Sequence, residues 1–200
     1  MAIETRTFGR TGADVTILGY GAMELRGEPR GPKVDDEDAG RLLNAVLDGG
    51  MSGILPHLPE HIAMGVFDVF QVPYSAVQRE HEDLITEATG EGAGTLIRGG
   101  AARGAPSAEK NWRQGPLSQA AGAGQRNWEA ASLNDLLAEA GLSPMEFTLR
   151  FTLSHPGLSS TIVGTSSPAH LRDNIAVAER GPLPKDVHEE AKRRLPPPGA

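Results

Sequence analysis

Four short segments with strand-like composition alternate with helical segments along this chain of 200 residues. They lie at residues 16–25, 66–74, 94–98 and 160–164, where β-branched and apolar residues cluster between turn signals. Strands that alternate with helices usually pair in parallel, because a right-handed helical crossover brings the chain back to the same end of the sheet. The pattern therefore predicts an α/β fold with a parallel sheet.

Turn and capping signals place the other elements. Residues 3–17 predict a β-hairpin around the turn at Gly9–Gly12, since clustered glycines between two short apolar runs favour a turn. Ser143 before Pro144 predicts a helix start, with the serine as N-cap and the proline at the first helical position. The helices expected from periodicity span residues 35–48, 59–65, 78–90, 128–140, 143–155, 168–180 and 185–195.

The alternation is interrupted after the first helix. Gly49 and Gly50 end that helix, and a buried strand should come next. Pro56 and Pro59 exclude a central strand there, because proline cannot donate to the hydrogen-bond ladder. One strand–helix unit is therefore followed by a gap in the pattern.

Composition excludes several functions. The net charge is −7 and the basic residues are scattered, which argues against a nucleic-acid partner. The chain has no cysteine, so disulfides and thiolate chemistry are excluded. No apolar run is long enough to cross a membrane, and the N-terminus lacks a hydrophobic leader. We expect a cytoplasmic protein without a membrane partner.

Four motifs resemble the aldo/keto reductase family, in the family's order. FGRTGADVTILGYGAMEL is similar to its opening hairpin and first barrel strand, and FDVFQVPYS to its sixth strand. GAGTLIRGGAARG is similar to the seventh strand and the loop after it, and TIVGTSSPAHLRDN to the eighth strand and its helix. The resemblance implies a partial (β/α)8 TIM barrel with an N-terminal β-hairpin, in one truncated domain over residues 1–195, followed by a disordered tail at 196–200.

The strands retained would be one, six, seven and eight. They form one continuous arc, because strand eight adjoins strand one in a closed barrel. The chain passes from LDGG, after the first strand and helix, to MSG, which resembles the end of the fifth strand. A complete barrel typically needs roughly 250 residues. The resemblance therefore implies an internal deletion between Gly50 and Met51.

The implied deletion removes the family's catalytic residues. In the family, an Asp and a Tyr follow the second strand, a Lys lies at the third and a His at the fourth, and no segment of this chain matches them. We therefore assign no catalytic residue. Tyr20 is interpreted as a side chain that fills the barrel, and Tyr74 as an aromatic residue that packs on the rim.

The resemblance implies a dinucleotide, NADP(H) or alternatively NAD(H), across the carboxyl ends of the strands. Ser52 and Gln71 match the residues that bind the nicotinamide carboxamide, and Arg98 stands where an aromatic residue commonly stacks on the ring. Backbone N–H groups would approach the pyrophosphate in the segment Gly99, Gly100 and Ala101, where the lack of side chains allows close contact.

The adenosine end would lie after the last strand. The residues that match the site of the 2′-phosphate and adenine are Gly164, Thr165, Ser166, Ser167, His170, Asp173 and Asn174. Gly53, Gly164 and His170 stand where the family usually has Asn, Lys and Arg. The charge that selects NADP over NAD is therefore reduced.

Three functions remain open. The chain can be related by descent to oxidoreductases that reduce small-molecule carbonyl substrates, with its own catalysis impaired. Two copies can pair through exposed sheet edges to form a homodimer. The chain can also be a non-catalytic nucleotide-binding or interaction module. His57 and His61 have helical spacing but no third ligand, so no metal site is assigned.

Overall fold

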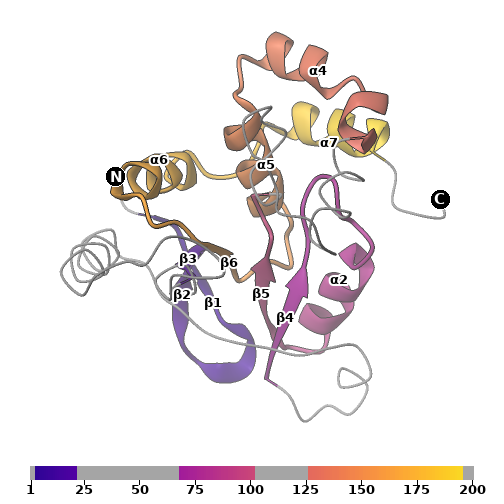
Figure 1. Ribbon diagram of the computed structural model, residues 1–200. Helices are drawn as coiled ribbons and strands as arrows, with labels where there is room; N and C mark the ends of the chain where they lie inside the picture. The colour runs from indigo at the N-terminus through magenta and orange to yellow at the C-terminus, as the bar shows by residue number, and fades with distance from the viewer. Residues whose placement is uncertain (1–2, 22–67, 102–125, 196–200) are drawn as a thin grey trace, which may run out of the picture.

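A parallel sheet forms the centre of the computed structural model, which describes residues 3–21, 68–101 and 126–195 (Figure 1). Before it comes an antiparallel hairpin of β1 (Thr5–Thr7) and β2 (Asp14–Thr16), joined by the short 3-10 helix η1 (Gly9–Thr11). The sheet strands are β3 (Leu18–Tyr20), β4 (Val69–Pro73), β5 (Gly94–Arg98) and β6 (Ser160–Val163). The expected hairpin and the four strand segments are thus confirmed.

The four strands pair in the order β3-β6-β5-β4, and every pairing is parallel. Leu18 pairs with Thr161, so two segments that are far apart in the sequence lie side by side in the sheet. Hydrogen bonds extend this contact beyond the strand, since the Thr161 N–H donates to the Ile17 carbonyl at 2.9 Å. The parallel α/β sheet expected from the sequence is confirmed.

Five helices are described around this sheet: α2 (Glu82–Gly90), α4 (Leu133–Ala140), α5 (Pro144–Leu153), α6 (Pro168–Ala178) and α7 (Lys185–Arg194). In Figure 1, α2 lies beside β4, and α4 and α7 lie together at the top of the view. Helices expected at 35–48 and 59–65 fall outside the described residues.

Two helix boundaries differ from the sequence prediction. The helix predicted from residue 78 begins only at Glu82, because Ser75 and Gln78 form a tight turn with two backbone hydrogen bonds. The helix predicted over 128–140 is broken, because Ser132 adopts a left-handed backbone conformation at φ 48°. A hydrogen bond connects the two sides of the break: the Trp128 indole N–H donates to the Asn134 side chain at 2.9 Å. The Trp128 ring is buried against Phe147.

The two faces of the sheet carry different contacts. On one side Phe70, Val72, Ile97 and Val163 join the large core formed with the helices; we call this the helix face. On the other side Val69, Leu96 and Ile162 pack with Phe8 and Val15 of the hairpin; we call this the hairpin face. Because side chains alternate along a strand, the remaining residues of the hairpin face are Gly19, Gln71, Pro73, Gly94, Arg98 and Ser160.

The hairpin is fixed to the sheet by close backbone contact. A Cβ atom on Gly94 would lie 2.6 Å from the Phe8 ring and 3.1 Å from the Gly9 nitrogen, so only glycine allows this approach. Arg6 adds a hydrogen bond from its guanidinium to the Leu158 carbonyl at 2.8 Å. These contacts hold the hairpin across the amino-terminal end of the sheet.

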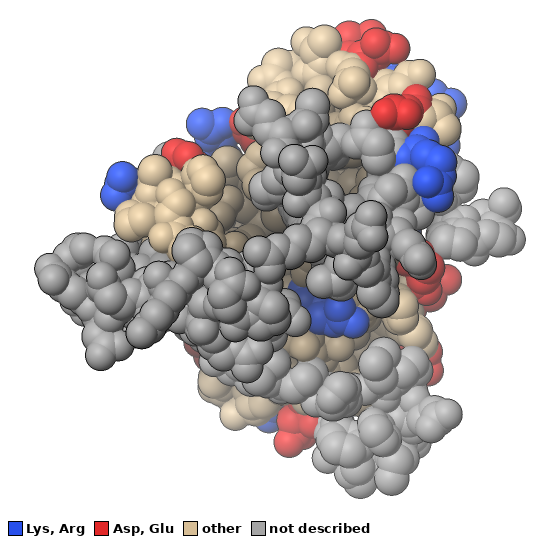
Figure 2. All heavy atoms as spheres, viewed as in Figure 1, with Lys and Arg blue, Asp and Glu red and all other residues tan. Residues whose placement is uncertain are grey.

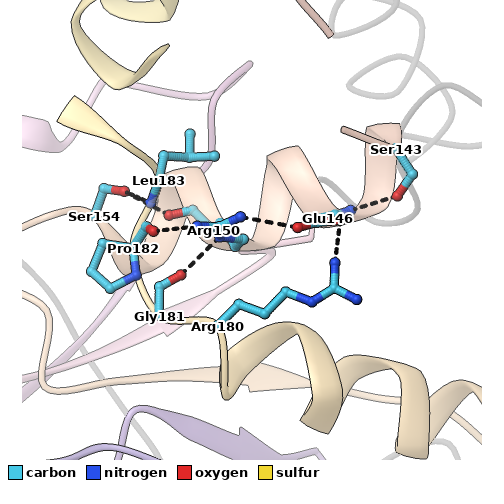
Figure 3. A network of polar contacts seen from close by, with 8 residues as sticks. All are labelled: Ser143, Glu146, Arg150, Ser154, Arg180, Gly181, Pro182 and Leu183. Atoms are coloured by element: carbon cyan, nitrogen blue, oxygen red, sulfur yellow. Dashed lines mark hydrogen bonds and ion pairs between the residues drawn. The ribbon is translucent and has the colours of Figure 1, made fainter. Parts of the chain in front are cut away.

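A buried polar network joins α5 to the end of α6 (Figure 3). Glu146 accepts from Arg150 at 2.9 Å and from Arg180 at 2.7 Å, and its own backbone N–H donates to the Ser143 hydroxyl at 3.2 Å. The expected N-cap at Ser143 is therefore confirmed. Arg150 also donates to the Pro182 carbonyl at 2.7 Å. This network sets the position of α6, whose amino terminus faces the strand ends.

Replacing Gly94 with alanine should destabilise the fold. The new methyl group meets the Phe8 ring and the Gly9 backbone, and we expect the free energy of unfolding to fall by about 1–3 kcal/mol, as for other overpacked sites. Urea unfolding followed by circular dichroism measures the change. Gly90→Ala is the matched control, since no atom lies within 4 Å of that added Cβ. Equal stability of the two variants would contradict the packing described for Gly94.

Candidate functional site

The carboxyl ends of the four parallel strands lie at one edge of the sheet, where ligands bind in open α/β sheets. Strands β3, β4, β5 and β6 end at Tyr20, Pro73, Arg98 and Val163. Most of the residues expected to bind a cofactor are brought to this edge. Ser52, and the neighbouring departure at Gly53, lie outside the described residues.

The turn after β5 combines a free cation with two glycines. The Arg98 side chain is exposed and makes no hydrogen bond or ion pair with another described residue. Gly99 has φ +75° and open space where a side chain would lie. Gly100 is buried, and a Cβ there would come within 2.3 Å of the Thr161 hydroxyl. Arg98 and Gly99 are therefore open to a ligand, whereas Gly100 and its half-buried neighbour Ala101 lead into the core.

The turn after β6 leads into the amino terminus of α6. The Ser167 hydroxyl accepts from the His170 N–H at 3.3 Å and caps the helix. The Ser167 N–H donates to the Thr165 hydroxyl at 3.1 Å. Gly164, Ser166 and His170 are exposed, so their polar groups can reach a ligand. A helix amino terminus favours anions because its first N–H groups and its dipole point toward them.

The remaining expected residues occupy different positions. Gln71 is 9% exposed and lies on the hairpin face, one residue pair below the strand ends. Asp173 is exposed on α6, whereas Asn174 is 7% exposed and turned toward the core. Asp173 can therefore contact a ligand at the helix surface, but Asn174 contributes mainly to packing.

The two tyrosines of the chain both point away from the hairpin face. Tyr20 packs in the core of the helix face, and its hydroxyl donates to the Thr165 carbonyl at 2.7 Å. Tyr74 is fully buried and packs edge-on against His155, with ring centroids 5.1 Å apart. Burial raises the pKa of Tyr74 above its ordinary value, so it stays a neutral phenol. The interpretation of Tyr20 as filling the barrel is wrong, because it belongs to the helix face. Tyr74 follows the last residue of β4 and packs on Phe151 and His155, on the side of the helix face.

A buried ionic cluster lies beside Tyr74, and the sequence analysis missed it. Arg79 donates to Glu82 at 2.6 Å and to the carbonyls of Lys192 and Leu195 at the end of α7. Lys192 also pairs with Glu82. Burial opposes the negative charge, but hydrogen bonds from Lys192 and Arg79 outweigh it and lower the pKa of Glu82. The cluster joins α2 to α7 on the helix face.

Two histidines pack near this cluster. Burial lowers the pKa of His155, which accepts from the Gly157 N–H at 3.0 Å. Burial also lowers the pKa of His188, whose Nε2 atom is buried without a hydrogen-bond partner. Both side chains therefore take up a proton at a lower pH than an ordinary histidine does.

No other chemistry emerges from the described part of the chain. Within residues 3–21, 68–101 and 126–195, no three His, Asp or Glu side chains converge as metal ligands. His57 and His61 lie outside these ranges. In the same ranges, no helix has both the length and the apolar character needed to span a bilayer.

A surface cavity of about 450 Å³ lies at the opposite, amino-terminal end of the sheet. It is lined by the hairpin, the turn before β5 and the turn before β6, including Arg6, Arg10 and Ser159. Arg10 pairs with Asp68 at 2.8 Å, and Arg6 with Glu4 at 2.9 Å, so the positive charge there is largely compensated. None of the residues expected to bind a cofactor lines this cavity.

Comparison with known proteins identifies the family. The model of the aldo/keto reductase family matches residues 64–194, which is more than half of the chain. The chain therefore belongs to the aldo/keto reductase family. No curated protein sequence matches it significantly.

Solved structures share the fold. The aldo-keto reductase AKR11C1 from Bacillus halodurans matches in its apo form with a TM-score of 0.64, 16% identity and 96% coverage of both chains. Its holo form gives the same TM-score and coverage at 13% identity. PA4992 from Pseudomonas aeruginosa, assigned to the aldo-keto reductases, matches with a TM-score of 0.51 and 14% identity, over 88% of this chain and 94% of its own.

Lowering the pH should destabilise the fold in two stages. The folded pKa values of His155 and His188 are below the ordinary value of about 6.5. Their contribution to stability is therefore complete above that value and is lost as the pH falls below it, because the unfolded chain binds protons first. Glu82, with its lowered pKa, adds a further loss below its ordinary value of 4.5. Urea unfolding at a series of pH values measures both stages.

The histidine stage can be separated with one variant. His188→Leu removes the titrating ring next to Phe151, and we expect the fall in stability between about pH 6.5 and pH 5 to become shallower. His170→Leu makes the same change at an exposed position and controls for the substitution itself. An unchanged slope in His188→Leu would contradict the role of burial at this histidine.

Proposed function

We propose that this chain binds NADP(H) across the carboxyl ends of its parallel strands and does not reduce carbonyl substrates efficiently. The observation that carries the proposal is the placement of the two tyrosines. Tyr20 and Tyr74 both belong to the helix face, whereas the cofactor residues lie at the strand ends and on the hairpin face. The chain therefore keeps groups suited to a dinucleotide but offers no tyrosine hydroxyl to a substrate beside it.

Several residues fit the phosphate groups of such a cofactor. The capped amino terminus of α6 presents N–H groups and the hydroxyls of Thr165 and Ser166, which suit an adenosine 2′-phosphate. Arg98 offers a guanidinium without a partner among the described residues, and Gly99 beside it offers an open backbone segment; both suit a pyrophosphate. NAD(H) is the alternative cofactor, because Gly164 and His170 supply less fixed positive charge than the usual Lys and Arg.

The strand assignment supports the same proposal. The order β3-β6-β5-β4 is the order expected for barrel strands one, eight, seven and six. In the family, catalysis depends on residues that follow the missing strands. The described lysines, Lys185 and Lys192, both lie on α7, and Lys192 is paired with Glu82. Loss of a general acid typically costs about 10²- to 10⁴-fold in rate.

The wider parts of the proposal follow from family membership. A bound nicotinamide would supply the two electrons of a carbonyl reduction, and the substrate class would be small-molecule carbonyl compounds. A cytoplasmic location stays a prediction. A homodimer is also proposed, because β3 and β4 are the outer strands of the described sheet, and an unpaired strand edge can pair with a second copy.

Titration with NADPH tests binding and catalysis separately. We expect saturable quenching or enhancement of NADPH fluorescence, together with no measurable oxidation of NADPH when a model aldehyde or ketone is added. Turnover at a rate normal for the family would contradict the claim of impaired catalysis. The absence of NADPH and NADH binding would contradict the claim of a cofactor site.

One variant checks that binding occurs at α6. Ser167→Asp keeps an N-cap of similar quality, so the free energy of unfolding should stay within about 0.5 kcal/mol. The added carboxylate repels a phosphate, and we expect the affinity for NADPH to fall at least about tenfold, or ~1.4 kcal/mol. Ser143→Asp makes the same exchange at the N-cap of α5, away from the strand ends, and is the control. Equal affinities in both variants would place the cofactor elsewhere.

A further inference from the structure

The hairpin face of β4, β5 and β6 carries three polar side chains, Gln71, Arg98 and Ser160. Gln71 of β4 pairs with Leu96 of β5, and Leu96 pairs with Ser160 of β6, so Leu96 lies between the two polar residues in one row. Arg98 lies two residues further along β5, in the row above. Rows on one face of a sheet are separated by about 7 Å, and an arginine side chain can span that distance. We call Gln71, Arg98 and Ser160 the hairpin-face polar group.

These side chains have no partners within the described part of the chain. The Ser160 residue is 3% exposed, and its Oγ atom is buried without a hydrogen bond. No side-chain hydrogen bond joins Gln71 or Arg98 to another described residue. A buried hydroxyl without a partner costs free energy of folding. The polar atoms of these side chains therefore do not stabilise the sheet through hydrogen bonds to other described residues.

The charge around the group has one sign. The segments that end the strands, residues 20–21, 70–78, 98–101 and 163–168, contain one charged residue, Arg98. They contain no Asp or Glu, although the whole chain has a net charge of −7. Beside Arg98, the neighbours in its own row are the uncharged Pro73 and Ile162. Figure 2 shows acidic and basic side chains mixed around the outside of this view, without a continuous patch of either sign.

We infer that Arg98 binds an anionic group of a ligand, a carboxylate or a phosphate, beside Gln71, which lies one row below it on the neighbouring strand β4. The inference deepens the proposed function, because this ligand would share the strand-end site with the cofactor. The position of Arg98 is one where the family commonly stacks an aromatic ring. A free guanidinium with no carboxylate among its described neighbours instead favours recognition by charge, since arginine binds carboxylate and phosphate with paired hydrogen bonds.

Two sources can supply the anion, and they require different probes. One is a phosphate of the dinucleotide, and the other is a carboxylate on the carbonyl substrate. The probes are therefore NADPH, inorganic pyrophosphate and 2-oxoglutarate, with 2-pentanone as a neutral carbonyl compound. Isothermal titration calorimetry of the full chain measures each affinity at low and at high salt.

Arg98→Gln removes the charge and keeps a polar side chain. We expect the affinity for at least one anionic probe to fall about 10- to 100-fold, since hydrogen bonds to charged groups contribute on that scale. The salt dependence of that affinity should weaken as well. Arg98→Lys should retain part of the affinity, whereas Arg98→Tyr, which restores only stacking, should not.

Lys185→Gln is the matched control, because it removes one positive charge from an exposed position on α7. It should leave every affinity unchanged. Ser160→Ala removes the hydroxyl that has no partner, so its fold should be at least as stable as the parent. Because that hydroxyl is buried, the substitution should leave the affinity for every probe unchanged. Circular dichroism confirms that each variant is folded.

The outcomes separate this inference from the proposed function. Weaker binding of NADPH and pyrophosphate in Arg98→Gln identifies the cofactor phosphate as the anion. Weaker binding of 2-oxoglutarate alone identifies a substrate carboxylate. If NADPH does not bind but 2-oxoglutarate binding depends on Arg98, the inference holds and the proposed cofactor function fails. The inference is overturned if no anionic probe binds the parent chain, or if Arg98→Gln binds every probe as the parent does.

Discussion

The pairing of β3 with β6 is the contact on which the described fold depends. It joins residues 18–20 to residues 161–163, so segments far apart in the sequence become part of one sheet. The pairing is reinforced on both sides, by the Thr161 hydrogen bond to Ile17 and by the Gly21 N–H, which donates to the Val163 carbonyl at 2.8 Å. Because all four strands then run in parallel, their carboxyl ends meet at one edge. The candidate cofactor residues come together through this arrangement and not through proximity in sequence.

The division of the sheet into two faces decides the chemistry available at that edge. The helix face is filled by a large core and by the ionic cluster of Arg79, Glu82 and Lys192. Both tyrosines belong to this face; the Tyr20 hydroxyl donates to the Thr165 carbonyl, and the Tyr74 hydroxyl is buried without a hydrogen-bond partner among the described residues. The hairpin face carries Arg98, Gln71 and Ser160, which have no partners in the described chain. The three candidate binding side chains and the two tyrosines are thus on opposite sides of the strands.

Local signals in the sequence predicted the elements well. Strands with β-branched runs, such as Ser160–Val163, and helix starts with Ser-Pro, such as Ser143-Pro144, depend on nearby residues only. The orientation of Tyr20 and Tyr74 was not predicted, because one residue of register decides which face a strand side chain occupies. The Arg79 cluster was not predicted either, since it joins residues 79 and 82 to residue 192 through tertiary packing. The break at Ser132 was not predicted either, since serine carries no local signal for its left-handed backbone conformation.

Family membership is typical of a carbonyl-reducing enzyme, whereas the candidate site favours cofactor binding without efficient catalysis. The family match covers residues 64–194 and includes the last three strands of the sheet. The absence of the family's catalytic residues stays part of the proposal, because it rests on the sequence motifs alone. A chain of this kind can retain the anion-binding end of a dinucleotide site, because the groups that make it come from the turns after β5 and β6.

A crystal structure of the chain with NADPH would test the central claim most directly. The account predicts cofactor density across the ends of β5 and β6, with a phosphate at the amino terminus of α6 and no tyrosine hydroxyl beside the nicotinamide. Density for the cofactor at the amino-terminal end of the sheet would contradict the account. Density that places Tyr20 or Tyr74 against the nicotinamide would contradict it equally.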